Sequence, residues 1–272
     1  MSERTIDYDN GPGKVLSNRE IAPDHFLMEL AAPFDLSRAR PGQFVMIRVS
    51  EGITPVLRRP FGICSMNKDR GSFTILYRVV GPGTKILSDI PEGLELDILG
   101  PLGRGFDVAL AGEAPLLIAG GVGVPPLFML AAALVKNGKK PEVIIGGRSA
   151  SDLLFVEEFK KIGLKALAAT EDGSEGFKGY VTGILEEMIS GGRAPSVIYS
   201  CGPGPMLKRV GEIAIESGIA CQLSLEAVMA CGFGVCLGCV LKTCSIDRPD
   251  ETDYSRVCAE GPVFDAREII WE

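Results

Sequence analysis

The stretch Leu116-Leu-Ile-Ala-Gly-Gly-Val-Gly-Val-Pro-Pro126 passes from an apolar run through a cluster of glycines into a pair of prolines. It lies in an uncharged segment, 114–135, that is long enough to span a bilayer. Glycine and proline at its centre disfavour one continuous helix. The stretch therefore predicts a buried strand, a glycine turn and a buried helix.

The same alternation continues downstream. Apolar runs and expected helices follow one another, in the order 127–136, 143–145, 152–161, 164–169, 183–189, 197–199 and 206–217. Fully apolar strands that alternate with helices are typical of a doubly wound parallel sheet. We expect this α/β domain to occupy residues 109–220.

Two glycine-rich turns in this region are candidates for binding a nucleotide. Each joins a strand to a helix, so both are expected at the carboxyl edge of the sheet, where ligands bind. Glycine lets the backbone approach a pyrophosphate, and a helix N-terminus offers free N–H groups. A tight turn without a ligand, with a cysteine that only fills space, is the alternative. The predicted coenzyme-binding residues are Gly120, Gly121, Gly123, Cys201, Gly202 and Pro203.

The first part of the chain has the period-two alternation of half-buried strands. It is clearest at 72–79 and 94–98, and 43–49 is a further β-rich run. Turn-forming residues recur between the runs, at 81–83, 91–93 and 100–103. Short strands with frequent turns predict a small antiparallel β-barrel over residues 1–108.

Near the C-terminus, Cys231-Gly-Phe-Gly-Val-Cys236-Leu-Gly-Cys239 has the C-x4-C-x2-C spacing of a plant-type [2Fe–2S] site. Cys258 is the expected fourth ligand, and Cys244 is the alternative. Zinc usually takes paired cysteines or cysteine with histidine, and buried free thiols are a further alternative. We expect a small metal-stabilised unit over residues 221–272.

Composition and charge exclude some classes of partner and some cellular compartments. A net charge of −7 and a pI near 5.0 argue against a nucleic-acid partner. The N-terminus has no apolar segment of the secretory kind, and cluster thiolates need a reducing compartment. These observations favour the cytoplasm, and no membrane span is expected.

Two arginine-containing segments in the barrel region suggest a flavin site. In Arg58-Arg59-Pro60-Phe61-Gly62, fixed cations and an aromatic ring suit a phosphate and a flat cofactor. Tyr77-Arg78 and the following Gly83-Thr84 add a further cation, a glycine turn and a hydroxyl. Arginines on an acidic protein are also often simple surface charges.

Together, the R-P-aromatic, Y-R-x-x-G-x-G-T, G-P-L-G-x-G-F, GGxGxPP, CGPxPM and cysteine motifs resemble the ferredoxin-reductase-like flavoproteins, in particular the electron-transfer subunits of dihydroorotate dehydrogenase B. The resemblance implies FAD between the barrel and the α/β domain, NAD(H) on the α/β domain, and an FMN-containing catalytic subunit in a hetero-oligomer. By motif matching it implies a flavin site of Arg59, Pro60, Phe61, Gly62, Leu76, Tyr77, Arg78, Gly83 and Thr84. The family usually has serine or threonine in place of Gly62, and a shorter loop between Cys239 and Cys258.

The implied activity, part of pyrimidine biosynthesis, is electron transfer from dihydroorotate at the partner's FMN, through the cluster and FAD, to NAD+. The cofactors supply this chemistry, so we expect no catalytic side chain. Two alternatives remain: the same module serving another oxidoreductase, such as a sulfide- or glutamate-synthase-linked partner, and a nucleotide-binding iron–sulfur redox sensor. Arg148 and Ser149 would suit the 2′-phosphate of NADP, whereas Glu171 and Asp172 would suit the ribose hydroxyl of NAD. The choice of NAD over NADP therefore rests mainly on the resemblance.

Overall fold

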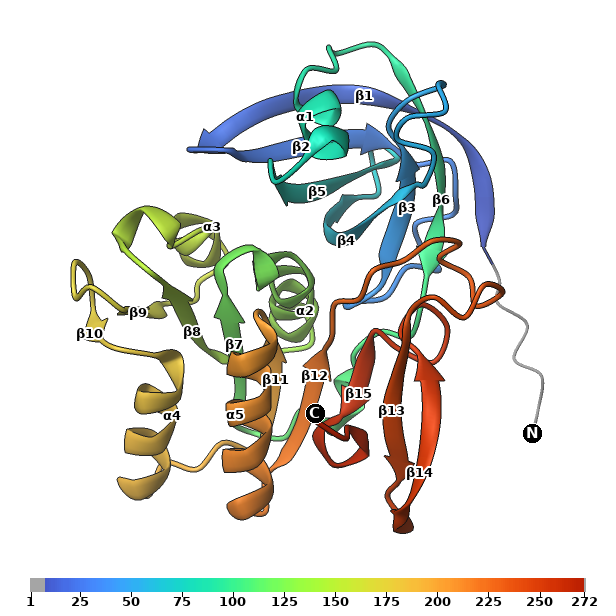
Figure 1. Ribbon diagram of the computed structural model, residues 1–272. Coiled ribbons are helices and arrows are strands. Elements are labelled where there is room, and N and C mark those ends of the chain that lie inside the picture. Colours follow the sequence, from blue (N-terminus) through green and yellow to red (C-terminus); the bar gives the residue numbers. More distant parts are fainter. Residues whose placement is uncertain (1–7, 272) are drawn as a thin grey trace.

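The computed structural model describes residues 8–271. Residues 1–7, where we expect no secretory signal, lie outside the described part of the chain. Figure 1 shows a barrel above an α/β layer, with a two-stranded unit beside that layer and below the barrel. This arrangement confirms the predicted combination of an antiparallel barrel, a parallel α/β domain and a small C-terminal unit.

The barrel is closed in the order β1-β2-β5-β4-β3-β6. The side chains that point into the barrel form a core in which Val15, Met28, Ile47 and Ile75 are fully buried. The elements are β1 (Asp9–Ala22), β2 (His25–Ala31), β3 (Phe44–Arg48), β4 (Arg59–Asn67), β5 (Ser72–Arg78), α1 (Pro82–Ser88) and β6 (Glu95–Leu102).

Two of the turns that we predict in the barrel region differ from the structure. The glycine turn at 81–83 opens a short helix, α1, because Pro82 suits a first helical position and the Thr84 hydroxyl accepts from the backbone N–H of Gly81. The expected turn at 100–103 is largely strand. There β6 continues to Leu102, since it pairs with β1 on one side and β3 on the other.

The α/β layer is a seven-stranded sheet with the order β10-β9-β8-β7-β11-β12-β15. All neighbours are parallel except the edge strand β15, which is antiparallel to β12. The strands are β7 (Pro115–Gly120), β8 (Glu142–Gly147), β9 (Ala166–Thr170), β10 (Phe177–Lys178), β11 (Val197–Cys201), β12 (Ala220–Ser224) and β15 (Val263–Asp265). The helices are α2 (Val124–Lys136), α3 (Val156–Lys161), α4 (Val181–Ser190) and α5 (Gly204–Glu216).

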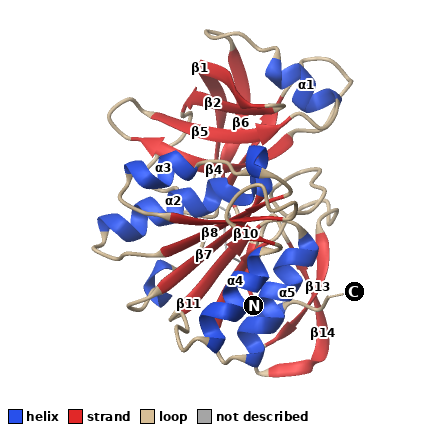
Figure 2. Ribbon diagram, turned by 90° about the vertical axis from the view of Figure 1, so that its left-hand side faces the viewer, coloured by secondary structure: helices blue, strands red, loops and turns tan. Residues whose placement is uncertain are grey.

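Helices cover both faces of this sheet, as Figure 2 shows. Alternate residues of a strand point to opposite faces, so Leu117 and Tyr199 pack with α2 and α3, whereas Leu116 and Ile198 pack with α4 and α5. The segment 114–135 is therefore β7 followed by a glycine turn and α2, as predicted. No helix in residues 8–271 is long and apolar enough to cross a membrane.

The helix expected over 152–161 is shorter than predicted. A 3-10 turn covers Ala150–Asp152, and Phe155 has the left-handed φ of 64°, so α3 begins only at Val156. Short 3-10 turns also occupy Val108–Leu110, Gly121–Gly123 and Ala266–Glu268.

The C-terminal unit is a hairpin of β13 (Val240–Ser245) and β14 (Arg248–Arg256) together with the cysteine loop before it. A hydrophobic cluster joins Cys239, Cys258 and Met229 to Phe44 and Met46 of the barrel. Although we expect this unit to begin at residue 221, β12 belongs to the parallel sheet.

Candidate functional site

A cavity of about 500 Å³ lies between the barrel and the α/β layer. Every residue that motif matching assigns to the flavin lines it: Arg59, Pro60, Phe61, Gly62, Leu76, Tyr77, Arg78, Gly83 and Thr84. On the opposite wall are Val122, Pro125 and Pro126 of the first glycine turn and its helix. The structure thus brings together segments of β4, β5, α1 and α2 that are far apart in the sequence.

On the barrel side of this cavity, the side chain of Arg59 packs against Gly83. A Cβ atom added to Gly83 would lie 2.6 Å from Nε of Arg59. The Arg59 guanidinium also donates to the Leu57 carbonyl. This is the close packing that a fixed cation facing a phosphate requires.

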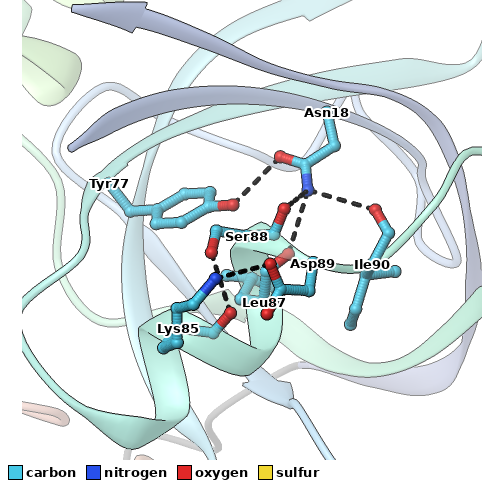
Figure 3. A network of polar contacts seen from close by, with 7 residues as sticks. All are labelled: Asn18, Tyr77, Lys85, Leu87, Ser88, Asp89 and Ile90. Carbon is cyan, nitrogen blue, oxygen red and sulfur yellow. Dashed lines mark hydrogen bonds and ion pairs between the residues drawn. The ribbon is translucent and has the colours of Figure 1, made fainter. Parts of the chain in front are cut away.

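Tyr77 is fixed by a polar network behind the cavity (Figure 3). Its hydroxyl donates to Oδ1 of Asn18 at 2.9 Å, and Nδ2 of Asn18 donates to the carbonyls of Leu87 at 2.9 Å and Ile90 at 3.2 Å. Asn18 therefore ties β1 to β5 and to the end of α1. Burial raises the pKa of Tyr77, so its hydroxyl keeps its proton. We did not predict a role for Asn18, because its partners are 59 to 72 residues away in the chain.

Gly62 lies on β4 opposite the two prolines of α2. A Cβ atom at Gly62 would be 3.6 Å from Cδ of Pro126 and 3.9 Å from Cβ of Pro125, which are ordinary contact distances. The position therefore has room for the Cβ atom of a side chain such as serine.

A second cavity, of about 670 Å³, opens at the carboxyl edge of the parallel sheet. Among the predicted coenzyme residues, Gly120, Gly121, Gly123, Gly202 and Pro203 line it. Cys201 instead lines the flavin cavity. Burial raises the pKa of the Cys201 thiol to about 12, so this sulfur is a neutral neighbour.

The two glycine turns touch one another. A Cβ atom at Gly123 would be 2.4 Å from the carbonyl oxygen of Cys201, and one at Gly202 would be 3.0 Å from the backbone nitrogen of Gly120. Glycine at these two positions therefore lets the turns pack against each other. Gly121, which has a left-handed φ of 53°, lines the cavity, and apart from its chain neighbours nothing lies within 4 Å of an added Cβ atom there. The backbone of this turn therefore fits a ligand that approaches it closely, as a pyrophosphate does.

The two cavities meet. Arg78, Val122 and Glu226 line both of them. Glu226 was not predicted, since nothing in the sequence distinguishes it from a surface carboxylate. It stands in the cleft between the domains, where surrounding protein raises its pKa by desolvation although the side chain still reaches solvent.

The predicted cluster ligands lie in pairs. The thiols of Cys231 and Cys236 interact, and the backbone N–H of Cys258 donates to Sγ of Cys239 at 3.4 Å. Within residues 8–271, no three side chains of His, Cys, Asp or Glu surround one point that a single metal ion could fill. A two-iron cluster held by four cysteines needs two ligands on each iron, so paired thiols suit it. The alternative ligand, Cys244, donates to the carbonyl of Arg267 at 3.3 Å.

The cysteine loop stabilises a thiolate at Cys231. Desolvation raises the pKa of the Cys231 thiol, but hydrogen bonds from the backbone N–H groups of Cys236 and Phe233 outweigh this effect and lower the pKa to about 6. Gly232 and Gly234 have left-handed φ values of 83° and 89°, as expected for a loop that wraps closely. The loop therefore fits an iron–sulfur cluster.

An arginine that we did not predict anchors this loop. Nη1 of Arg256 donates to the Gly234 carbonyl at 2.6 Å, and Nε donates to Glu260 at 3.0 Å. This side chain joins the cysteine loop to the turn that carries Cys258.

Comparison with known proteins agrees with this geometry. The model described as the iron-sulfur cluster binding domain of dihydroorotate dehydrogenase B matches residues 226–270. The oxidoreductase NAD-binding domain matches residues 117–212, and the oxidoreductase FAD-binding domain matches residues 12–106. The electron transfer subunit of dihydroorotate dehydrogenase B (NAD(+)) from Fusobacterium nucleatum is 42% identical over 258 residues, 94% of this chain and 96% of that relative.

The chain belongs to this family of electron transfer subunits. The subunit of the same name from Bacillus pumilus is 40% identical over 257 residues, again 94% of this chain and 96% of that relative. The predicted family is confirmed, as are the predicted cofactor classes: FAD, NAD(H) and an iron–sulfur cluster.

Solved structures show the same arrangement. A chain of an NADH-dependent reduced ferredoxin-NADP oxidoreductase has a TM-score of 0.83 at 30% identity, covering 100% of this chain and 92% of that chain. A ferredoxin reductase of carbazole 1,9a-dioxygenase has a TM-score of 0.67 at 20% identity, covering 79% and 68%, and shares the fold.

Proposed function

We propose that the chain is the electron transfer subunit of a dihydroorotate dehydrogenase, and that it exchanges electrons between NAD(H) and an FMN-containing catalytic subunit in pyrimidine biosynthesis. The observation that carries this proposal is the junction of the two cavities at Arg78, Val122 and Glu226. A coenzyme in the larger cavity would face a flavin in the smaller one across these residues. Family membership over 94% of the chain supports the identity of the partner.

A bound FAD would supply two-electron exchange with the nicotinamide and one-electron exchange with the cluster. The residues of the chain itself would bind these cofactors and orient them. Arg59 and Arg78 offer fixed cations to phosphates, and Phe61 offers a ring to a flat cofactor. Gly123 and Gly202 let the two turns pack together at the cavity, where the N-termini of the following helices would face the coenzyme pyrophosphate.

We propose Cys231, Cys236, Cys239 and Cys258 as ligands of a [2Fe–2S] cluster. The contacts of Cys231 with Cys236 and of the Cys258 backbone N–H with Sγ of Cys239 support this set, and the hydrogen bond of Cys244 to Arg267 points that thiol elsewhere. The cluster unit packs against the barrel through Phe44 and Met46, which brings it close to the flavin cavity that Phe44 also lines.

We also propose the cytoplasm as the compartment, because cluster ligation needs reduced thiols. The domain boundaries at residues 108 and 220 remain proposals, and limited proteolysis of the holoprotein would test them.

The proposal is tested by anaerobic titration of the purified protein with NADH, followed by absorption spectroscopy. We expect both flavin and iron–sulfur bands to bleach. A colourless protein, or cluster bands that NADH never changes, would contradict the electron-transfer assignment.

The partner is tested by co-expression with an FMN-containing dihydroorotate dehydrogenase subunit. We expect a stable complex that reduces NAD+ with dihydroorotate, and a complex unable to use NAD+ when Cys258 is replaced by serine. Strong NADH-driven bleaching without any dihydroorotate activity would favour another oxidoreductase partner.

A further inference from the structure

The coenzyme cavity has a wall that the α/β domain does not supply. Most of its lining residues come from the parallel sheet and its helices, but His25 and Arg78 come from the barrel. His25 is the chain's only histidine, and only 6% of its surface is exposed. No role follows for it from the electron-transfer chemistry described above.

The tautomer of His25 is set by its neighbour. Nδ1 lies 2.7 Å from the carbonyl oxygen of Pro23. A carbonyl only accepts, so Nδ1 carries the hydrogen. In the neutral ring, Nε2 is then an acceptor. Among residues 8–271 the Pro23 carbonyl is the one hydrogen-bond partner of this imidazole, and His25 is one of the residues that line the cavity.

The backbone around His25 is firmly held. His25 pairs with Arg78 across the β2–β5 ladder. The next rung is extended by the backbone N–H of Val79, which donates to the carbonyl of Asp24 at 2.8 Å. Beside it, Phe26 stacks on Tyr77 with ring centroids 5.6 Å apart. The imidazole is therefore presented from a rigid edge of the barrel.

His25 lies near one end of the coenzyme cavity. Its partner Arg78 lines both cavities, whereas Arg148, Asp152 and Glu171 line the coenzyme cavity alone. His25 thus lies toward the end that adjoins the flavin. Because hydride transfer requires the nicotinamide to approach the flavin, the coenzyme half at this end is the nicotinamide riboside. That half carries two kinds of hydrogen-bond donor, the carboxamide NH2 and the ribose hydroxyls.

We propose that His25 is a coenzyme-positioning residue, whose Nε2 accepts a hydrogen bond from the nicotinamide riboside half of NAD(H) while Nδ1 is held by the Pro23 carbonyl. This inference rests on the proposed function of the cavity. It adds a barrel residue to a site that sequence motifs place wholly on the α/β domain.

Two substitutions separate the roles of the two nitrogens. His25→Asn keeps an amide donor near the Pro23 carbonyl but removes the acceptor Nε2. His25→Gln extends an amide oxygen toward the position of Nε2. In the holoprotein, with NADH as donor and ferricyanide as acceptor, we expect His25→Asn to raise KM for NADH by about fivefold, the range of one hydrogen bond, with kcat little changed. His25→Gln should recover part of this loss.

The bound FAD, the iron content and the Tm of each variant show whether the fold is intact. An unchanged KM in a His25→Asn variant that keeps its cofactors would overturn the inference. A loss of flavin or a lowered Tm that accounts for the whole effect would also overturn it, because His25 would then be structural. If the wild-type protein itself were not reduced by NADH, the proposed function would fail instead.

An analogue identifies the donor group. In 3-acetylpyridine adenine dinucleotide the carboxamide NH2 is replaced by a methyl group. If the carboxamide donates to His25, the difference between wild type and His25→Asn should disappear with this analogue. If a ribose hydroxyl donates, the difference should persist. A larger difference with the analogue than with NADH would contradict both assignments.

Discussion

The guanidinium of Arg59 lies directly over Gly83, so that a Cβ atom on Gly83 would be only 2.6 Å from Nε. The two residues come from β4 and α1, and both line the flavin cavity. Glycine at position 83 is therefore what allows the arginine to occupy this wall.

Replacement of Gly83 by alanine should displace Arg59 and weaken FAD binding by about tenfold, the effect expected when a charge-assisted hydrogen bond to phosphate is lost. Equilibrium binding of FAD to the apoprotein measures this. Gly81→Ala is the matched control, because no atom of the described residues lies within 4 Å of its added Cβ. Equal FAD affinity in the Gly83→Ala and wild-type proteins would contradict the prediction.

Replacement of Gly62 by serine should be tolerated. The added Cβ meets Pro126 at an ordinary 3.6 Å, and Gly62 does not have a left-handed φ. We expect an unchanged Tm, full flavin content, and faster anaerobic reduction by NADH in stopped-flow absorption, since a hydroxyl would be added to the flavin cavity. A variant that unfolds or loses its flavin would show that the space at Gly62 is not available.

The two candidate fourth ligands give opposite predictions. Cys258→Ser should abolish the iron–sulfur absorption and the electron paramagnetic resonance signal of the reduced protein, while its flavin is retained. Cys244→Ser should keep both signals, because this thiol donates to the Arg267 carbonyl instead. Loss of the cluster in Cys244→Ser, with the cluster intact in Cys258→Ser, would exchange the two assignments.

Coenzyme choice should depend on Glu171. It lines the coenzyme cavity, where its carboxylate would repel a 2′-phosphate and accept from a ribose hydroxyl. Glu171→Gln should raise the ratio of kcat/KM for NADPH to that for NADH by about fivefold, the range for an exposed charge pair. Asp172→Asn is the control: its carboxylate accepts from Ser174 at 2.6 Å. An equal rise in the control would assign the effect to net charge alone.

Glu226 should make the protein less stable as pH rises. Desolvation raises its pKa in the folded state, so between the unfolded and folded pKa values the folded state binds more protons. Stability then falls as pH increases through that window. Glu226→Gln should raise Tm near pH 8, and this gain should shrink as pH falls toward 5. A gain that is constant, or that grows toward acid pH, would contradict the predicted sign.

Much of the fold could be predicted from local sequence. The apolar strands and glycine turns of the α/β layer, and the alternation along β5, depend on periodicities that a short window contains. The errors occurred where distant pairing decides. The end of β6 is strand because β1 and β3 flank it.

The candidate site divides in the same way. Glycine turns, the Arg59–Gly62 segment and the cysteine spacing are recognisable because their chemistry depends on neighbours in the chain. Asn18, Glu226, Arg256 and His25 gave no such signal. Each acts through contacts or cavities that join residues far apart in sequence.

The sequence by itself determined the strand and helix types, the cofactor classes and the family, since short motifs carry the backbone freedom and the ligand atoms that these cofactors need. Only the tertiary structure decided that the flavin and coenzyme cavities meet at Arg78, Val122 and Glu226, and that the barrel contributes His25 to the coenzyme wall. The physical reason is that a cavity is defined by the packing of separate domains, which no local pattern of residues specifies.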